Sequence, residues 1–187
     1  MHVEPYSSHH RDELRAICLA NAGELAQSNP TEQKFTLLMY CDPYLELGTA
    51  YVLLDDAGIA RGYILCAEDY GRWRHDFAPY ARCIANLSPD YERRMLEELA
   101  YYESVSQDYP AHLHIDIQED YTGVGGGRQL MEALIAQLRK HGVKGVTFGV
   151  SALNERAVGF YQHLGFDLLT EYGTPDDPGY TFGMRFI

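Results

Sequence analysis

Four glycines lie between a segment that reads as a strand and a segment that reads as a helix. They are Gly123, Gly125, Gly126 and Gly127. Glycine permits positive φ angles and lets a ligand approach the backbone closely. The first turn of a helix has unpaired N–H groups, and its dipole attracts negative charge. This pattern predicts a phosphate-binding turn. The alternative is a loop that only turns the chain, since short glycine motifs also occur without a ligand.

The segment before this turn carries three residues that can exchange protons. His112, His114 and Asp116 alternate along it, so in a strand they share one face, and the apolar residues between them share the other. His114 or Asp116 could act as a general base, directly or through a water molecule. The pattern is also compatible with a metal ion, but no further ligand is evident, and we predict no metal site. A structural alternative remains: a buried, hydrogen-bonded aspartate with surface histidines.

The composition narrows the class of protein. The chain has 187 residues, of which 46% are hydrophobic and 22% charged, which is typical of one globular domain with a substantial core. The net charge of −12 argues against binding to nucleic acids or anionic membranes and favours cationic or amine partners. A phosphate-bearing ligand would therefore depend on local backbone donors.

The cysteines and the apolar segments bear on the compartment. Cys18, Cys41, Cys66 and Cys83 are irregularly spaced and form no Cys-x-x-Cys pair, which is typical of reduced thiols. The sequence opens without a basic, apolar signal segment, and no stretch approaches the roughly 20 apolar residues of a membrane span. We therefore expect a cytoplasmic protein.

Helices and strands are expected to alternate along the chain. Strands are predicted at residues 1–5, 49–55, 59–69, 111–118, 144–151, 166–172 and 180–187, and helices at 8–26, 31–40, 88–107, 125–141 and 153–164. Turns are expected at 55–58 and 176–179, and residues 71–86 are compatible with a helix or an ordered loop. Interleaved helices and strands predict one α/β domain over residues 1–187 with a mixed sheet.

Two motifs resemble the signature of the GNAT superfamily of N-acetyltransferases. The run Tyr121-Thr-Gly-Val-Gly-Gly-Gly-Arg-x-Leu-Met131 resembles its pyrophosphate loop, and Asn154-Glu-Arg-Ala-Val-Gly-Phe-Tyr-Gln-His-Leu-Gly-Phe166 resembles its second motif. The matches cover residues 113–168 in the expected order and at the expected separation. The resemblance implies a single GNAT-like domain with a mixed, mostly antiparallel sheet flanked by helices, and acetyl-CoA as the cosubstrate.

The resemblance also implies roles for individual residues. The backbone of Ile115 and Ile117 would pair with the pantetheine arm, and Asn154 would contact acetyl-CoA through its amide. Tyr161 would also contact acetyl-CoA and act as general acid, because a departing thiolate needs a proton that a tyrosine hydroxyl can supply. The other implied cofactor-binding residues are Thr122, Gly123, Val124, Gly125, Gly126, Gly127, Arg128, Ala157 and Phe160. The alternative for Phe160 and Tyr161 is packing in the core.

One position departs from the family pattern. The GNAT loop usually has Arg or Gln where this chain has Thr122. The contact of a long side chain is lost there while the backbone donors remain. We therefore expect acetyl-CoA binding to be retained but weakened.

A narrower resemblance extends beyond the two motifs. The segments Tyr109-Pro-Ala-His-Leu-His-Ile-Asp-Ile117, Asp42-Pro-Tyr-Leu45 and Gly62-Tyr-Ile-Leu65 are similar to the acetyltransferase-like domain of O-GlcNAcases and its free-standing bacterial relatives. In O-GlcNAcases that domain is often regarded as a pseudo-acetyltransferase, whereas this chain retains the glycine turn, Asn154 and Tyr161.

An aromatic group is expected to form a wall over the acceptor site. It comprises Tyr40, Tyr44, Trp73, Phe77 and Tyr80, with Arg72, Arg74 and His75 adding polar recognition. The alternative is a core cluster between helices, which is the commoner use of such residues.

The sequence thus predicts an acetyl-CoA-dependent N-acetyltransferase that moves an acetyl group to a small amine by direct attack. Asp116 or His114 would be the base and Tyr161 the acid. The alternative is a catalytically silent acetyl-CoA-binding module that acts as a sensor or scaffold. The sequence does not identify the acceptor, and a homodimer stays open because dimers are common in the superfamily.

Overall fold

The strands pair into one sheet in the order β1-β2-β3-β4-β5-β7-β6. The computed structural model describes residues 1–186, so Ile187, the last residue of the predicted final strand, lies outside it. The strands are β1 (His2–Pro5), β2 (Thr49–Leu54), β3 (Ala60–Ala67), β4 (Ala111–Ile117), β5 (Gly145–Ser151), β6 (Asp167–Thr174) and β7 (Asp177–Arg185). All neighbours are antiparallel except β4 and β5. The predicted mixed, mostly antiparallel sheet is confirmed.

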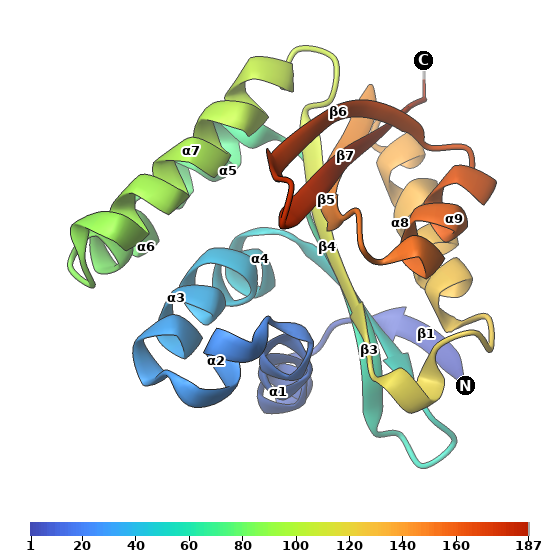
Figure 1. Cartoon of the computed structure of the whole chain (residues 1–187). Helices are drawn as coiled ribbons and strands as arrows, with labels where there is room; N and C mark the ends of the chain where they lie inside the picture. The colour runs from blue at the N-terminus through green and yellow to red at the C-terminus, as the bar shows by residue number, and fades with distance from the viewer. Residues whose placement is uncertain (187) are drawn as a thin grey trace.

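The parallel pair at the centre of the sheet separates after a short contact. Only Ala111 with Val146 and His112 with Thr147 are in register between β4 and β5. Beyond them β4 continues to pair with β3 alone, and β5 with β7 alone. The edge of β4 from Leu113 to Ile117 is therefore unpaired on the side facing β5, and the two strands diverge there (Figure 1).

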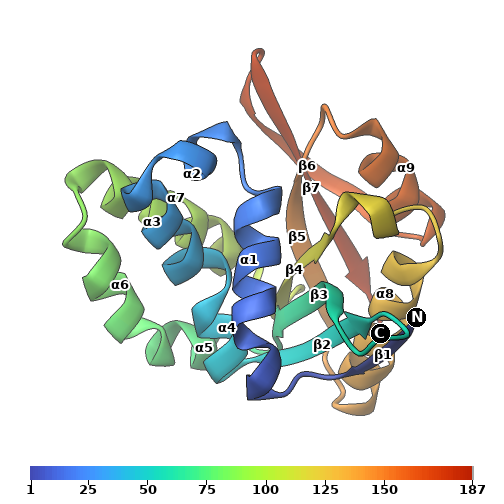
Figure 2. The same ribbon diagram turned by 90° about the horizontal axis from the view of Figure 1, so that it is seen from below.

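Helices cover both faces of the sheet. One face carries α1 (Arg11–Asn21), α2 (Glu24–Ser28), α3 (Pro30–Tyr40), α4 (Asp42–Leu47), α5 (Tyr70–Asp76), α6 (Ala78–Ala85) and α7 (Pro89–Val105). The other carries α8 (Gly126–Lys140) and α9 (Glu155–His163), as Figure 2 shows from below. Short 3₁₀ turns span Ser8–His10 and Glu119–Tyr121. Within residues 1–186, no helix has the length and apolarity needed to cross a membrane.

The two faces have separate buried clusters because side chains alternate along each strand. Tyr63 and Leu65 of β3 pack with α1, α3 and α7. Ile64 and Cys66 point the other way, into the cluster beneath α8 and α9. Strand β3 is therefore apolar on both faces, whereas β4 has polar side chains on one face only, and this difference fixes the register of β4.

Some element boundaries differ from those predicted. The helix expected over 8–26 is interrupted because Ala22 is extended, with ψ of 157°, and α2 begins only after Gly23. Helix α4 was not predicted. The ambiguous segment 71–86 forms two helices, and a proline lies in the first turn of α6. The turn expected at 176–179 is wrong: Thr174 pairs with Asp177, so the turn lies at residues 175–176, β7 already includes residues 177–179, and the hairpin is longer.

Candidate active site

A cavity of ≈ 390 Å³ opens where β4 and β5 diverge. We call it the glycine-turn cavity. Its lining includes every residue predicted to bind the cofactor except Val124 and Gly126, together with Asp116, Asn21 and Arg156. Residues from β4, from the turn and from both helices of the smaller layer therefore converge on one space.

The glycines of the turn serve two purposes. Gly123 and Gly125 have φ angles of 75° and 94°, which glycine adopts readily and other residues rarely. A Cβ on Gly126 would lie 2.5 Å from Leu53 Cδ2, and one on Gly127 would lie 3.3 Å from Phe160 Cζ. The first two shape the turn, and the last two let α8 pack closely against its neighbours. Gly126 is buried in that packing, which explains why it does not line the cavity.

The amino end of α8 faces this cavity with its backbone donors available. Gly125 is the N-cap, and no side chain accepts a hydrogen bond from the first turn. Two guanidinium groups are added by Arg128 and Arg156. Arg156 Nη1 donates to Thr122 Oγ1 at 2.8 Å, so a cation from α9 reaches the residue that interrupts the family pattern. The cavity wall is thus positive in a protein whose net charge is −12.

Asn154 and Tyr161 lie on the α9 side of the cavity. Asn154 Oδ1 caps the helix by accepting from Ala157 N at 3.1 Å, which leaves the amide NH₂ free to donate to a ligand. The ring of Tyr161 packs on Phe148 with centroids 4.4 Å apart. Burial raises the pKa of Tyr161, and the nearby Asp116 carboxylate raises it further, so the hydroxyl keeps its proton at neutral pH.

The polar residues of β4 face the larger helical layer, as their alternation predicts. Asp116 accepts a hydrogen bond from the Tyr63 hydroxyl, and burial raises the pKa of its carboxyl to about 6. Burial lowers the pKa of His114 to about 4, and its Nε2 is buried without a hydrogen-bond partner within residues 1–186. Of the two, Asp116 has the pKa closer to neutrality and is the better candidate for a base.

His112 is buried more deeply than the other two. It stacks on Tyr102 at 4.2 Å and meets Trp73 edge-on at 4.7 Å. Burial holds its pKa well below the ordinary value, so the imidazole is neutral. Among the described residues, no three His, Cys, Asp or Glu side chains converge in a way that could hold a metal ion.

Two further cavities continue from the glycine-turn cavity across β4. The middle cavity, of ≈ 300 Å³, shares Asn21 and Asp116 with it. A larger cavity of ≈ 680 Å³ shares Tyr40, Arg94 and His114 with the middle one. We call the larger cavity the tyrosine chamber, because Tyr40, Tyr101, Tyr102 and Tyr172 line it. Shared residues thus link the glycine turn to the space beside α7.

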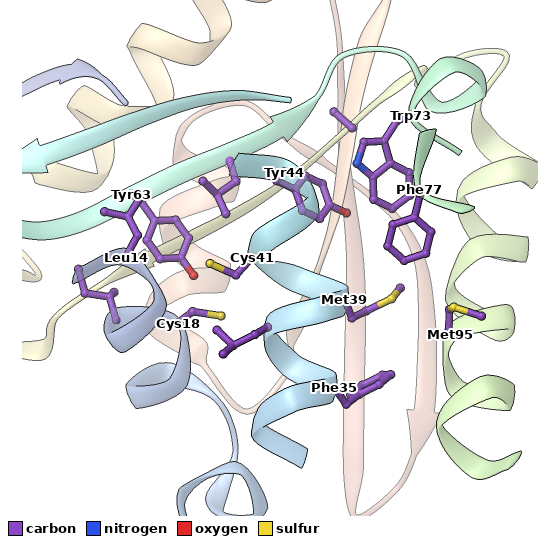
Figure 3. Close-up of a cluster of buried hydrophobic side chains, with 14 of the residues drawn as sticks. Leu14, Cys18, Phe35, Met39, Cys41, Tyr44, Tyr63, Trp73, Phe77 and Met95 are labelled. Atoms are coloured by element: carbon purple, nitrogen blue, oxygen red, sulfur yellow. The ribbon is translucent and has the colours of Figure 1, made fainter. Parts of the chain in front are cut away.

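The aromatic wall expected over the acceptor site is wrong in most of its members. Tyr44, Trp73 and Phe77 are between 0% and 3% exposed and lie inside the core of the larger layer (Figure 3). The side chains of Arg72 and His75 are each 87% exposed on α5 and line none of the three cavities. Only Tyr40 reaches the cavities. Large aromatic rings between helices contribute more by filling the core than by facing solvent.

Comparison with known proteins identifies the family. The model of the acetyltransferase (GNAT) family matches residues 27–166. The chain belongs to the GNAT family. Its members are N-acetyltransferases, and the protein is accordingly an acyltransferase.

Solved GNAT structures resemble the whole chain. The crystal structure of SsHAT is 32% identical, with a TM-score of 0.76 over 98% of this chain and 96% of the other. A polyamine N-acetyltransferase of Drosophila melanogaster, described as forming N-acetylagmatine, is 16% identical, with a TM-score of 0.68 over 98% and 99%. An agmatine N-acetyltransferase is also 16% identical, with a TM-score of 0.69 over 98% of each chain. The last two show the fold alone. The narrower resemblance to the O-GlcNAcase domain stays a prediction.

The glycine-turn cavity of this GNAT protein suits the cosubstrate that the family uses in general, acetyl-CoA. Its diphosphate requires donors and positive charge, which the amino end of α8, Arg128 and Arg156 offer. Its pantetheine arm requires a free strand edge, which β4 offers from Leu113 to Ile117. The residues present therefore fit acetyl-CoA.

Sequence reasoning missed two residues of this cavity, Arg156 and Asn21. Arg156 lies within the second GNAT motif, and a cation in the first turn of α9 is disfavoured by the helix dipole, which was a usable signal. Asn21 ends α1, far away in sequence, and its amide donates to Ile17 O at 2.9 Å. Nothing local in the sequence marks it.

Proposed function

We propose that the protein transfers the acetyl group of acetyl-CoA to the amine of a small acceptor. The observation that carries this proposal is the glycine-turn cavity, which runs from a positive helix end along the free edge of β4 to Asp116 and Tyr161. An anion site, an open strand edge, a base and an acid are the four elements that such a transfer needs.

Distinct groups would hold the parts of acetyl-CoA. The backbone N–H groups at Gly125 to Gly127 would bind the diphosphate, with Arg128 and Arg156 adding charge. The backbone of Ile115 and Ile117 would hydrogen-bond the pantetheine arm as an added strand does. The bound cosubstrate supplies an acetyl thioester, whose carbonyl carbon is open to attack by an amine.

Asp116 and Tyr161 would then handle the protons. Asp116 accepts the proton that the amine nitrogen loses as the new C–N bond forms, either directly or through a water molecule. Tyr161 donates its hydroxyl proton to the sulfur as the C–S bond breaks. With a pKa of about 6, Asp116 is ionised at neutral pH, and burial keeps Tyr161 protonated, so both groups start in the required state.

His114 is the other candidate base, and its environment is less suited to the task. Its pKa of about 4 makes it a weak proton acceptor, although the residue lines two of the cavities and its Nε2 has no hydrogen-bond partner within residues 1–186. We assign it to contact with the acceptor rather than to proton transfer.

The test is the release of the CoA thiol over a panel of amines, together with calorimetric binding of acetyl-CoA. Tyr161→Phe should lower turnover about 100-fold and leave binding within about twofold, because only the acid is removed. Tyr180→Phe, which removes a hydroxyl from the same buried cluster outside the cavity, is the matched control. An unchanged rate in Tyr161→Phe removes that residue from the acid role. Normal binding without turnover on any amine would instead favour the silent binding module.

A further inference from the structure

Glu98 of α7 is a buried carboxyl group without a cationic partner. Its side chain lines the tyrosine chamber and accepts hydrogen bonds from Tyr40 at 2.8 Å and Tyr102 at 3.2 Å. No ion pair joins it to a Lys, Arg or His side chain anywhere in residues 1–186. Burying a carboxylate without a compensating cation is costly. Burial raises the pKa of Glu98, and the hydrogen bonds from Tyr40 and Tyr102 and the more distant charge of Arg94 offset only part of that rise. Within residues 1–186 the chain therefore holds, beside a cavity, a carboxyl group that has no direct ion-pair partner.

The one guanidinium in the chamber does not supply that cation. Arg94 binds both carboxylate oxygens of Glu32, with both N–O distances at 2.9 Å, and lies over the Phe35 ring at 4.4 Å. Its charge is thus matched by a carboxylate on α3. Glu97, which also lines the chamber, is ion-paired with Arg93 at 2.8 Å. Asp177 lines the chamber as well and, like Glu98, forms no ion pair within residues 1–186, so these two carboxyl groups give the wall its acidic character.

The other walls of the chamber suit a cation on a hydrocarbon chain. Tyr101 and Tyr172 line it, and the faces of aromatic rings attract cations and also pack against methylene groups. His114 lines both the chamber and the middle cavity, and its Nε2 is buried and unpartnered within the described chain. Asp116 lines the middle cavity, which shares Tyr40, Arg94 and His114 with the chamber. The two cavities are therefore neighbours, and a flexible molecule that occupied both would have one end at Asp116 and the other in the chamber.

We propose that the tyrosine chamber binds a second positive charge of the acceptor, so that the preferred acceptor is a small dication such as a diaminoalkane. One amine reaches Asp116 for acetylation, and the second ammonium group lies against Glu98 and the tyrosine rings. This inference rests on the proposed function, because it treats the molecule that enters the middle cavity as the acetyl acceptor.

The test compares cadaverine with pentylamine, which has the same five-carbon chain but lacks the second ammonium group. Binding of each amine to the CoA-loaded protein is measured by calorimetry, and thiol release is measured at saturating acetyl-CoA. Cadaverine should bind the wild-type protein about 10-fold or more tightly than pentylamine, because a desolvated charge pair is gained. The same preference should appear in KM for the amine.

Glu98→Gln keeps the shape of the side chain and removes the charge; its amide oxygen can accept from one of the two tyrosines, and its NH₂ can donate to the hydroxyl oxygen of the other. It should reduce the preference for cadaverine to near unity. Glu92→Gln removes the same charge from α7 outside the chamber and should leave the preference unchanged. Equal binding of the two amines to the wild-type protein, or a preference that survives in Glu98→Gln, overturns the inference.

Failure of this inference can be told apart from failure of the proposed function. Turnover of both amines at equal efficiency overturns the cation site and leaves the acetyltransferase intact. The opposite result, in which cadaverine binds through Glu98 but no thiol is released with any amine, supports the cation site and contradicts acetyl transfer.

Discussion

The two sides of β4 are built by different means. On the side of α8 and α9, the glycine-turn cavity includes three glycines of one turn, and all its lining residues except Asn21 lie between Ile115 and Tyr161. On the other side, the tyrosine chamber is lined by side-chain-bearing residues of α3, α7, β4 and the hairpin of β6 and β7, together with Gly149 of β5. The tip of that hairpin reaches toward α7 in Figure 1. A cosubstrate common to a family can be held by a local motif, whereas acceptor selectivity depends on distant segments meeting.

Asp116 lies where the two sides meet, and its loss should have the largest effect. Asp116→Asn should lower kcat about 100- to 1,000-fold, because the base is removed, while acetyl-CoA affinity stays within about twofold. In the wild-type protein, kcat/KM should rise with pH and level off above about 6, because the carboxyl must lose its proton before it can accept another. Steady-state kinetics between pH 5 and 9 check both effects. A pH profile unchanged by the substitution would remove Asp116 from the role of base.

A substitution that distorts the backbone of the glycine turn should weaken acetyl-CoA binding without affecting amine binding in the tyrosine chamber. Gly125→Val places a β-branched residue at a φ angle of 94° and should weaken acetyl-CoA binding about 10-fold or more. Amine binding should change little. Gly142→Val introduces similar strain at the other end of α8, where φ is 70°, and should lower stability without changing affinity. If Gly125→Val weakened the binding of acetyl-CoA and of the amine equally, the glycine-turn cavity and the tyrosine chamber would not be separate binding sites.

Substitution of Arg156 should have a smaller effect and tests the role of one positive charge in the glycine-turn cavity. Arg156→Gln should weaken acetyl-CoA binding about 5-fold, with a shallower salt dependence, because one charge near the diphosphate is lost. Adding Thr122→Arg to that variant restores a cation beside the turn and should recover most of the affinity. Lys140→Gln removes a charge from the far end of α8 and should have no effect. Without recovery in the double variant, the hydrogen bond to Thr122 would be merely structural.

The same burial that tunes Asp116 should cost the protein stability. Its pKa rises from 3.8 to about 6 in the folded protein, so the folded state holds the proton more tightly than the unfolded chain. Stability from this group is present below about pH 4 and is lost as pH rises through 6. Asp116→Asn should therefore be more stable than the wild type at pH 8 by about 3 kcal/mol. At about pH 3 the two should match, as urea unfolding can show.

The sequence predicted the residues of the glycine-turn cavity better than those of the tyrosine chamber, for physical reasons. The glycine turn and the alternation of His112, His114 and Asp116 are local patterns that dihedral preferences and strand geometry determine. The wall formed by Tyr40, Arg94 and Tyr172 depends on the packing of α3, α7 and a hairpin whose length was underestimated. Composition also could not tell buried aromatics such as Trp73 from exposed ones. The roles of individual site residues stay predictions.

The most direct test of the central claim is a crystal structure of the protein with CoA and cadaverine bound. Electron density should place the diphosphate at Gly123 to Gly127, the pantetheine arm along the free edge of β4, and the thiol beside Tyr161. It should place one amine of cadaverine near Asp116 and the other in the tyrosine chamber. Density for CoA away from the glycine turn, or for both ligands on the same side of β4, would contradict the account.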